Sequence, residues 1–345
     1  MIAQISGLLD TWWVPTIFRS LGGVAAVLLP AGPLVYLYLF KMMSFMQSRL
    51  GPMEAGPAGT MQLLAEVGKF FQKEDIFPSK ADRFVFGAAP FVVIVSSFLL
   101  VIVVPFGPDA WLADLDTGIF FALAVSSVSV IGILMAGWAS ASKYSMLGGL
   151  RAAGQLIAYE LPLVLAVMGV VVQAGTLNMN DIVFAQAEGE IFGFGGIGNP
   201  FIFTQFLGFV IFMIAMQAEL TQPPFDMPVA ESELVTGYIT EYSGIRFLLF
   251  FIGEFATAGI FAMIASVLFL GGWWVPGIDP DSNIFNILGP LVMFAKVLGV
   301  TFLVFWFRIT YPRFREDQLQ KLAWKVLIPL ALLNIVVTGI LKVAF

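Results

Sequence analysis

Long apolar stretches alternate with shorter polar connections along most of this chain. A helix needs about 20 predominantly apolar residues to cross the hydrocarbon core of a bilayer. We predict a membrane-spanning helix in each of eight stretches: 20–40, 84–106, 118–138, 155–174, 201–217, 247–271, 285–308 and 325–344. The connections are too short for a separate soluble domain. The pattern therefore predicts an all-α, polytopic membrane protein with one integral-membrane domain over residues 1–345.

The composition agrees with this class. Hydrophobic residues make up 59% of the chain, charged residues only 12%, and the mean hydropathy is +0.93. Soluble domains are about 45–50% apolar and about 25% charged. The chain has no cysteine and no histidine, which excludes disulfides, iron–sulfur clusters, haem and ordinary zinc sites. We expect any redox group to be bound by a partner, and the net charge of −6 argues against nucleic acid.

Lysine and arginine are distributed unevenly among the connections. Fourteen of the 17 cations lie in or beside the connections that follow the first, third, fifth and seventh predicted spans. The alternate connections have no cation but contain eight acids: Asp109, Asp114, Asp116, Asp181, Glu188, Glu190, Asp279 and Asp281. Because cytoplasmic loops carry excess lysine and arginine, we predict a cell inner membrane protein with both termini on the outer, periplasmic side. The N-terminus lacks a basic region and a cleavage site, so we expect no cleaved signal peptide.

The first cytoplasmic connection contains an amphipathic pattern. Two Gly-Pro pairs, Gly51–Pro52 and Gly56–Pro57, precede apolar residues at helical spacing: Met61, Leu64, Ala65, Gly68 and Phe71. Charged residues flank this stripe, so the spacing predicts an amphipathic helix. Two placements are open: the helix lies on the membrane or under a docked partner, or it caps the helix bundle.

The connection QAELTQPPFDMPVAESELVTGYITEYSG, from Gln217 to Gly244, is rich in acids without nearby cations. It contains Glu219, Asp226, Glu231, Glu233 and Glu241, and no lysine or arginine occurs before Arg246. Its prolines end the preceding helix. Glu231 and Glu233 are expected near the start of a short helix, where the helix dipole favours anions. Because that role leaves Glu219 and Glu241 unexplained, we interpret the segment as the re-entrant wall of a water-lined cavity.

Three ionisable residues fall inside predicted spans: Glu160, Glu254 and Lys296. Each costs at least about 2.5–3.5 kcal/mol to insert, so these side chains must face the bundle interior or a wet cavity. One arrangement is a static Glu254–Lys296 pair. The other is a polar track of Glu160, Glu219 and Glu254 whose deeper end is Lys296, which would suit proton transfer.

Four longer motifs place the chain beside a known family. They read MQSRLGP…GPAGTMQLLAEVGKFFQKED, GWASASKYSMLGGLRAAGQLIAYELPL, AELTQPPFDMPVAESELVTGYITEYSG and YPRFREDQLQKLAWKVLIPLALLN. In order and spacing they resemble the H subunit family of bacterial NADH-quinone oxidoreductase, whose mitochondrial counterpart is NADH dehydrogenase subunit 1 of respiratory complex I. The resemblance extends from about Met46 to Asn334.

The resemblance implies a membrane anchor beneath a hydrophilic redox arm, lining part of a quinone tunnel. The implied quinone-binding residues are Gln47, Arg49, Gly51, Pro52, Ala65, Glu66, Lys69, Phe225 and Asp226. The implied proton-coupling acids are Glu160, Glu219, Glu231, Glu233, Glu241 and Glu254, and we group Lys296 with them. Arg313 and Arg315 match a motif that packs near the arm. The resemblance further implies quinone as substrate, FMN and iron–sulfur clusters only in partner subunits, and proton-pumping subunits and lipid as further partners.

The sequence departs from the family at the end of the first span. Leu39 and Phe40 replace the usual acid and arginine, and Ser44 and Met53 replace a glycine and an asparagine. Two alternatives therefore stay open beside the quinone enzyme. The first is the homologous anchor of a membrane-bound hydrogenase or F420H2 dehydrogenase. The second is a stand-alone ion-coupled transporter, against which the absence of a visible inverted repeat argues.

Overall fold

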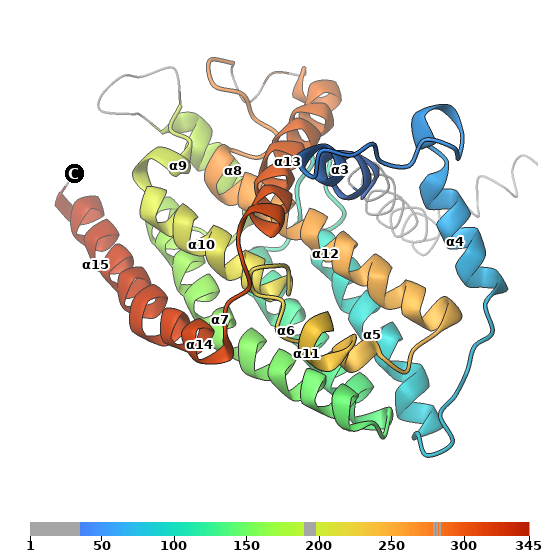
Figure 1. Ribbon diagram of the computed structural model, residues 1–345. Helices are drawn as coiled ribbons and strands as arrows, with labels where there is room; N and C mark the ends of the chain where they lie inside the picture. The colour runs from blue at the N-terminus through green and yellow to red at the C-terminus, as the bar shows by residue number, and fades with distance from the viewer. Residues whose placement is uncertain are drawn as a thin grey trace, which may run out of the picture.

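Helices form all the regular structure in the part of the chain that the structure describes. The computed structural model describes residues 35–108, 110–189, 198–278, 280, 282 and 284–344 (Figure 1). The all-α prediction is confirmed for these residues. Six helices are long and apolar enough to cross a membrane: α5 (Arg83–Val101), α6 (Gly118–Ala139), α7 (Lys143–Ala174), α12 (Gly244–Leu270), α13 (Phe285–Thr310) and the run of α14 (Glu316–Leu322), η4 (Ala323–Leu327) and α15 (Ile328–Ala344). They correspond to the second, third, fourth, sixth, seventh and eighth predicted spans.

The fifth predicted span is a broken helix. It consists of α9 (Phe201–Thr204) and α10 (Phe206–Glu219), separated at Gln205, whose φ of −111° and ψ of 35° are not helical. The amide of Gln205 accepts a hydrogen bond from Asn334 and donates one to Thr338, both in α15. With 14 residues, α10 is about 21 Å long, which is shorter than the hydrocarbon core of about 30 Å.

The first predicted span lies mostly outside the described residues. Its last residues belong to the π-helix η1 (Val35–Met42), which continues into α3 (Met43–Met46). The predicted count of eight spans is thus represented here by six long helices, one broken helix and the end of the first span.

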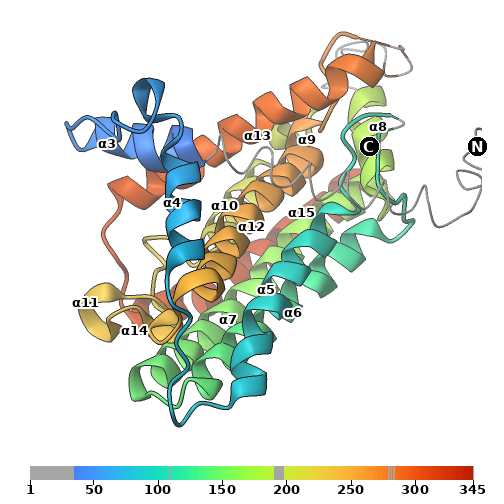
Figure 2. The ribbon, with the colours of Figure 1, turned by 90° about the vertical axis from the view of Figure 1, so that its right-hand side faces the viewer.

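The long helices pack side by side into one bundle (Figures 1 and 2). Within the bundle, α7 contacts α6, α10 and α15, while α12 contacts α5 and α13. Glycines allow α6 and α7 to approach closely, since a Cβ on Gly149 of α7 would lie 3.3 Å from the Cα of Gly137 in α6. Small residues at such crossings are typical of helix packing in membranes.

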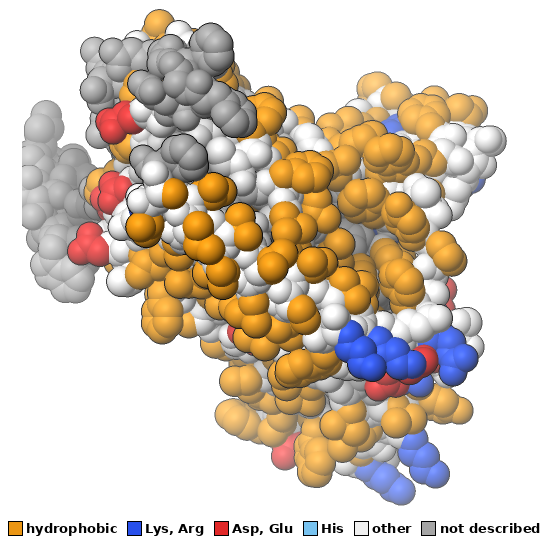
Figure 3. Space-filling model, turned by 90° about the vertical axis from the view of Figure 1, so that its left-hand side faces the viewer, with side chains coloured by type: hydrophobic (Ala, Val, Ile, Leu, Met, Phe, Trp, Pro, Cys, Tyr) orange, Lys and Arg blue, Asp and Glu red, His pale blue; other side chains and the backbone are white. Residues whose placement is uncertain are grey.

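Side chains of different type gather on different parts of the surface. Figure 3 shows the face on which α15 lies, and apolar side chains cover most of it. Lysine and arginine side chains gather toward the lower end of that view, whereas acids appear at its upper left. Acids also lie beside these cations, so the cations, rather than the acids, mark one end of this face.

The predicted amphipathic helix is α4 (Gln62–Gln72). It contacts α12 through the face that carries Leu63 and Phe70, and the Phe70 ring stacks on Phe247 at 5.5 Å. The apolar stripe noted in the sequence faces away from the bundle, with Leu64 65% and Phe71 63% exposed. The stripe itself therefore does not cap the bundle, which leaves it available to the membrane or a partner.

Candidate functional site

The acid-rich connection folds as an ordered segment between α10 and α12. It contains the short helix α11 (Glu231–Leu234) and the 3-10 turn η3 (Gly237–Ile239). Glu231 and Glu233 lie in the first turn of α11, so the predicted helix start is confirmed. Gly237 adopts a φ of +58°, and a Cβ there would lie 1.7 Å from the carbonyl oxygen of Pro228. This position therefore requires glycine.

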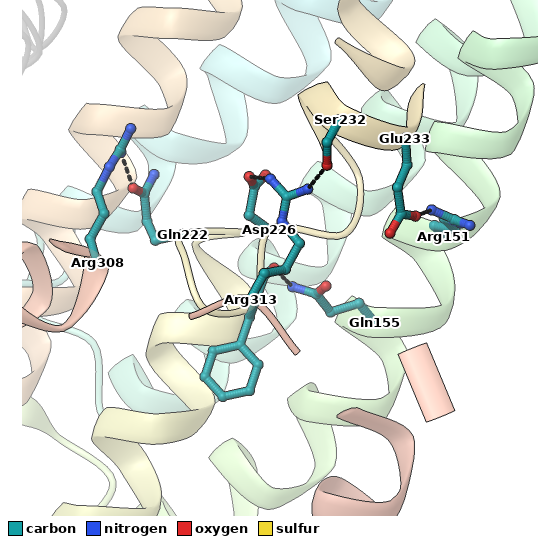
Figure 4. Close-up of polar contacts among 9 residues, drawn as sticks. Arg151, Gln155, Gln222, Asp226, Ser232, Glu233, Arg308 and Arg313 are labelled. Carbon is teal, nitrogen blue, oxygen red and sulfur yellow. Dashed lines mark hydrogen bonds and ion pairs between the residues drawn. The ribbon is translucent and has the colours of Figure 1, made fainter. Parts of the chain in front are cut away.

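Two of the five acids are paired, although the segment itself contains no cation. Arg313, between α13 and α14, donates to Asp226 at 2.7 Å and to the Ser232 hydroxyl at 3.0 Å. Arg151 of α7 donates to Glu233 at 2.6 Å (Figure 4). The order of residues does not reveal these pairs, because the two arginines lie more than 80 residues from their acids in sequence and reach them only through the tertiary fold.

A third cation reaches the segment through an uncharged side chain. Arg308, in the last turn of α13, donates to the side-chain oxygen of Gln222, as Figure 4 shows. The side-chain nitrogen of Gln222 in turn donates to Glu254 of α12. Sequence reasoning missed Arg308 and Gln222. The position of Arg308 at the end of an apolar helix, four residues before the PRFRED motif, was the available signal.

Phe225 is fixed by amide and ring contacts. The amide of Gln155, which is 2% exposed on α7, donates to the carbonyl oxygens of Ala218 and Phe225, both at 2.7 Å. The Phe225 ring lies 5.3 Å from the Tyr159 ring and 5.5 Å from the Phe314 ring. The residue before Asp226 is thus held by α7 and by the connection before α14, which restricts where the Asp226 carboxylate can lie.

The environment of Asp226 changes its protonation. Burial raises the pKa of Asp226, and the charge of Glu231 adds to this, while the charges of Arg313 and Arg308 and the hydrogen bond from Arg313 lower it. Burial prevails, and the pKa is raised overall. Burial and the charges of Glu254 and Asp226 also raise the pKa of Tyr238, so this hydroxyl stays protonated beside the two acids.

Glu160 and Glu219 form a separate pair of acids on α7 and α10. Glu160 accepts a hydrogen bond from Ser127 of α6 and interacts electrostatically with Glu219. One carboxylate oxygen of Glu219 is buried and has no hydrogen-bond partner among the described residues. A buried acceptor without a partner is uncommon and often marks a catalytic site or a bound water or ion. Glu241 is half-buried in the turn before α12.

Comparison with known proteins gives the family. A family model described as NADH dehydrogenase matches residues 20–339. The chain belongs to this NADH dehydrogenase family. It is 44% identical to the NADH-quinone oxidoreductase H subunits of Bacillus cereus (strain B4264) and of Bacillus thuringiensis (strain Al Hakam), in each case over 306 residues that cover 88% of this chain and 87% of the relative. The resemblance seen in the sequence is confirmed.

The family motif in the first connection lies apart from the acid-rich segment. Figure 2 shows α3 above the upper end of α4, whereas α11 lies beyond its lower end. Arg49 donates to Gln47 at 2.8 Å, and both are exposed. Gly51 is closely packed, since a Cβ there would lie 2.5 Å from the carbonyl oxygen of Phe40.

The other members of the first-connection set are held locally or exposed. The Lys41 ammonium donates to the carbonyl oxygen of Pro52 at 2.7 Å, and Gln62 donates to Glu66 at 3.1 Å. Ala65 and Lys69 are exposed on α4. These family positions therefore form a surface of their own.

Lys296 is bound to backbone carbonyls, and the predicted Glu254–Lys296 pair is wrong. Its ammonium donates to the carbonyl oxygens of Leu270 at 2.6 Å and Trp274 at 2.5 Å, at the C-terminal end of α12. Helix C-termini offer free carbonyls with partial negative charge. Glu254 lies 16 residues before Leu270 in the same helix, which is roughly 24 Å along its axis.

The two arginines of the PRFRED motif face different surroundings. Arg313 is turned onto Asp226 and Ser232, as described above. Arg315 pairs at 3.4 Å with Asp317 and its side chain is 83% exposed. Of these two arginines, Arg315 is thus the one whose side chain is exposed.

A cavity of about 350 Å³ borders Phe225. Its walls come from α10, the acid-rich segment, α13, the connection before α14, and α14. They are almost entirely apolar: Phe209, Val210, Met213, Ile214, Gln217, Pro224, Phe225, Leu303, Phe307, Tyr311, Phe314 and Leu322. No group of three acids that could hold a metal ion occurs among the described residues. The site therefore offers acids, arginines and apolar walls.

Proposed function

We propose that this chain is the membrane subunit of a complex-I-type NADH:quinone oxidoreductase, where it helps form the quinone site and couples quinone reduction to proton translocation. It has no redox centre of its own in this proposal. A hydrophilic arm with FMN and iron–sulfur clusters delivers electrons, and neighbouring membrane subunits translocate protons. The observation that carries the proposal is the acid-rich segment that Arg151, Arg308 and Arg313 bind from two other parts of the bundle.

The chemistry of quinone reduction suits such a segment. Reduction to quinol takes two electrons and two protons, so the charge near the headgroup changes by up to two units before the protons arrive. Two unit charges 4 Å apart interact by about 4 kcal/mol at an effective dielectric constant of about 20. A change of that size resets the protonation of nearby acids. Glu219, which is buried beside Glu160 with an oxygen that lacks a partner, is the best-placed acid to respond.

The relatives bear on the two alternatives. Those described above are named as subunits of NADH-quinone oxidoreductases. This naming favours the quinone enzyme over a hydrogenase or F420H2 dehydrogenase anchor, and favours a complex over a stand-alone transporter.

The test replaces Glu219 by glutamine in the complete complex. The E219Q variant keeps the side-chain shape. It also breaks no hydrogen bond at the buried carboxylate oxygen, because that oxygen has no partner among the described residues. In inverted membrane vesicles, we expect NADH-driven quinone reduction coupled to proton uptake to fall roughly tenfold or more, the scale of one lost proton-transfer group. E233Q, which keeps an oxygen to accept from Arg151, should also impair coupled turnover.

The matched control is E188Q, an exposed acid at the end of α8 (Met179–Glu188), far from this segment. All three variants should assemble to the wild-type level on native gels. Wild-type quinone reduction and proton uptake in both E219Q and E233Q would refute the coupling role.

A further inference from the structure

Gln222 links a cation of one helix to an acid of another. Its side-chain oxygen accepts from Arg308 of α13, and its side-chain nitrogen donates to Glu254 of α12. The residue is 2% exposed, so bulk water does not compete for this amide. We propose that Gln222 is a positioning residue that holds Arg308 and Glu254 in register, so that loss of the charge on Glu254 releases Arg308 and the segment carrying Asp226. Its part in quinone reduction rests on the proposed function.

The hydrogen-bonding chemistry of the three side chains supports this link. A guanidinium has only donors and an ionised carboxylate has only acceptors, whereas an amide has one group of each kind. Turning the amide over would set donor against donor at Arg308 and acceptor against acceptor at Glu254. An apolar residue at position 222 would leave both half-buried charged groups without this partner, which is costly.

Titratable and charged groups from three elements surround Glu254. Arg308 of α13 attracts its charge, Asp226 of the acid-rich segment repels it, and Tyr238 of η3 interacts with both acids. Arg308 also attracts Asp226. Hydrogen bonds to an ionised carboxylate are about twice as strong as those to a neutral one. Neutralising Glu254 therefore weakens its hydrogen bond with Gln222. The attraction of Arg308 to Asp226 then exceeds its attraction to Glu254.

The backbone carries a movement of Gln222 to Asp226. The amide N–H of Phe225 donates to the carbonyl oxygen of Gln222 at 2.9 Å, which closes a tight turn just before Asp226. The connection after α13 is bound to the same turn, since the N–H of Phe314 donates to Pro224 at 3.1 Å. Release at Gln222 would thus be felt at Asp226 and its partner Arg313.

The test is a double-mutant cycle read by amide hydrogen exchange of residues 220–228 in the resting, assembled complex. Q222M and E254Q are near-isosteric changes: Q222M removes both hydrogen bonds of the link, whereas E254Q keeps an acceptor oxygen and removes the charge on which the link depends. We expect each to speed exchange about tenfold, and the double variant to match the single ones because both remove the same interaction. The proposed link would be overturned if the increases in exchange rate multiplied in the double variant. It would also be overturned if either single variant exchanged at the wild-type rate.

Gln217 provides a matched control. It is also 2% exposed, but its amide donates to the backbone carbonyls of Pro223 and Val304. The Q217M change therefore removes buried hydrogen bonds without touching the charges. In the Q217M/E254Q double variant, the two increases in exchange rate should multiply, because the two changes remove independent interactions. Increases that do not multiply would show that the cycle reports general loosening, which would count against the proposal.

A charge swap separates the link from its role in the reaction. In the Q222E/E254Q variant, the acid at position 222 accepts from Arg308 and from the amide at position 254. We expect exchange within about threefold of wild type, while Q222E alone exchanges about tenfold faster because two acids then face each other. If Q222E/E254Q exchanges as fast as Q222E, the proposal is overturned.

Coupled quinone reduction should stay low in the swap, because the charge no longer lies on α12. Full recovery of turnover would show that the link is structural only and would overturn its role in the reaction. The exchange results need no quinone, so they decide the link even where E219Q shows the proposed function to be wrong.

Discussion

Arg313 and Asp226 form a 2.7 Å ion pair between residues that are 87 positions apart in the chain. The pair joins the connection after α13 to the sequence Pro224–Phe225–Asp226, which follows α10. Its side chains are 30% and 17% exposed, so it is partly shielded from water. This relationship gives the acid-rich segment a fixed position against the rest of the bundle.

Loss of Arg313 should loosen the segment. R313M leaves a buried carboxylate without its cation and Ser232 without its donor, and we expect a cost of about 1–3 kcal/mol. R313K should fall between R313M and wild type, because lysine lacks the fork that reaches two acceptors. Apparent melting temperatures of the purified complex measure this. R315M, which removes an exposed arginine, serves as the control, and equal losses in R313M and R315M would contradict the expectation.

Asp226 should make stability depend on pH. Its pKa in the folded chain is raised above the ordinary value of 3.8, mainly by burial. The folded state therefore favours protonated Asp226, and this contribution is complete below pH 3.8 and is lost as pH rises through the folded pKa. The melting temperature of wild type should fall relative to that of D226N as pH rises from 3.8. A difference that stays constant over that range would argue against a raised pKa.

Arg313 should set the upper end of this range. Its charge and hydrogen bond lower the pKa of Asp226 against the effect of burial. In R313M the pH-dependent loss should therefore extend to higher pH, whereas in R315M it should follow wild type. Melting curves of both variants at matched pH values make the comparison.

Close packing of α7 against η3 should tolerate no added methyl group. A Cβ on Gly148 would lie 2.6 Å from the backbone nitrogen of Tyr238, so G148A should displace the turn and reduce assembly of the complex. On the same helix, a Cβ on Gly154 meets its nearest atom at 3.9 Å. G154A should be neutral or stabilising by about 0.5–1 kcal/mol, because alanine favours helix. Native gels compare the two, and equal assembly would be unexpected.

The two faces of α4 should respond differently to a charge. L63D places a carboxylate among Leu39, Phe255 and Phe305, so it should destabilise the chain by about 2 kcal/mol or more. L64D lies on the outward stripe and should leave the fold intact while weakening membrane attachment or assembly. Melting of the isolated chain in detergent and its content in the complex report these effects separately. A destabilised fold in L64D would place the stripe against the bundle.

Lys296 should stabilise the end of α12 without taking part in proton coupling. K296M removes two hydrogen bonds from a charged donor, at a cost of about 1–3 kcal/mol. Because the ammonium lies roughly 24 Å from the level of Glu254, quinone reduction per assembled complex should change less than about twofold. A loss of quinone reduction as large as that of E219Q would instead support Lys296 as the deeper end of the polar track of acids.

The sequence by itself determined the membrane class, the positions of six long helices and the start of α11. These depend on the length of apolar runs and on local helix chemistry, which neighbouring residues decide. The four motifs also determined the family. The sequence did not reveal the break at Gln205, because hydropathy stays high through it and its cause is the hydrogen bonds with α15.

The tertiary structure alone decided which charges meet. Asp226, Glu233 and Gln222 find Arg313, Arg151 and Arg308 because helices that are distant in sequence end at the same side of the bundle. It also decided that Lys296 binds carbonyl groups and that the α4 stripe faces outward. Burial and pairing depend on how helices pack across the bundle, and the order of residues along each helix does not contain that information.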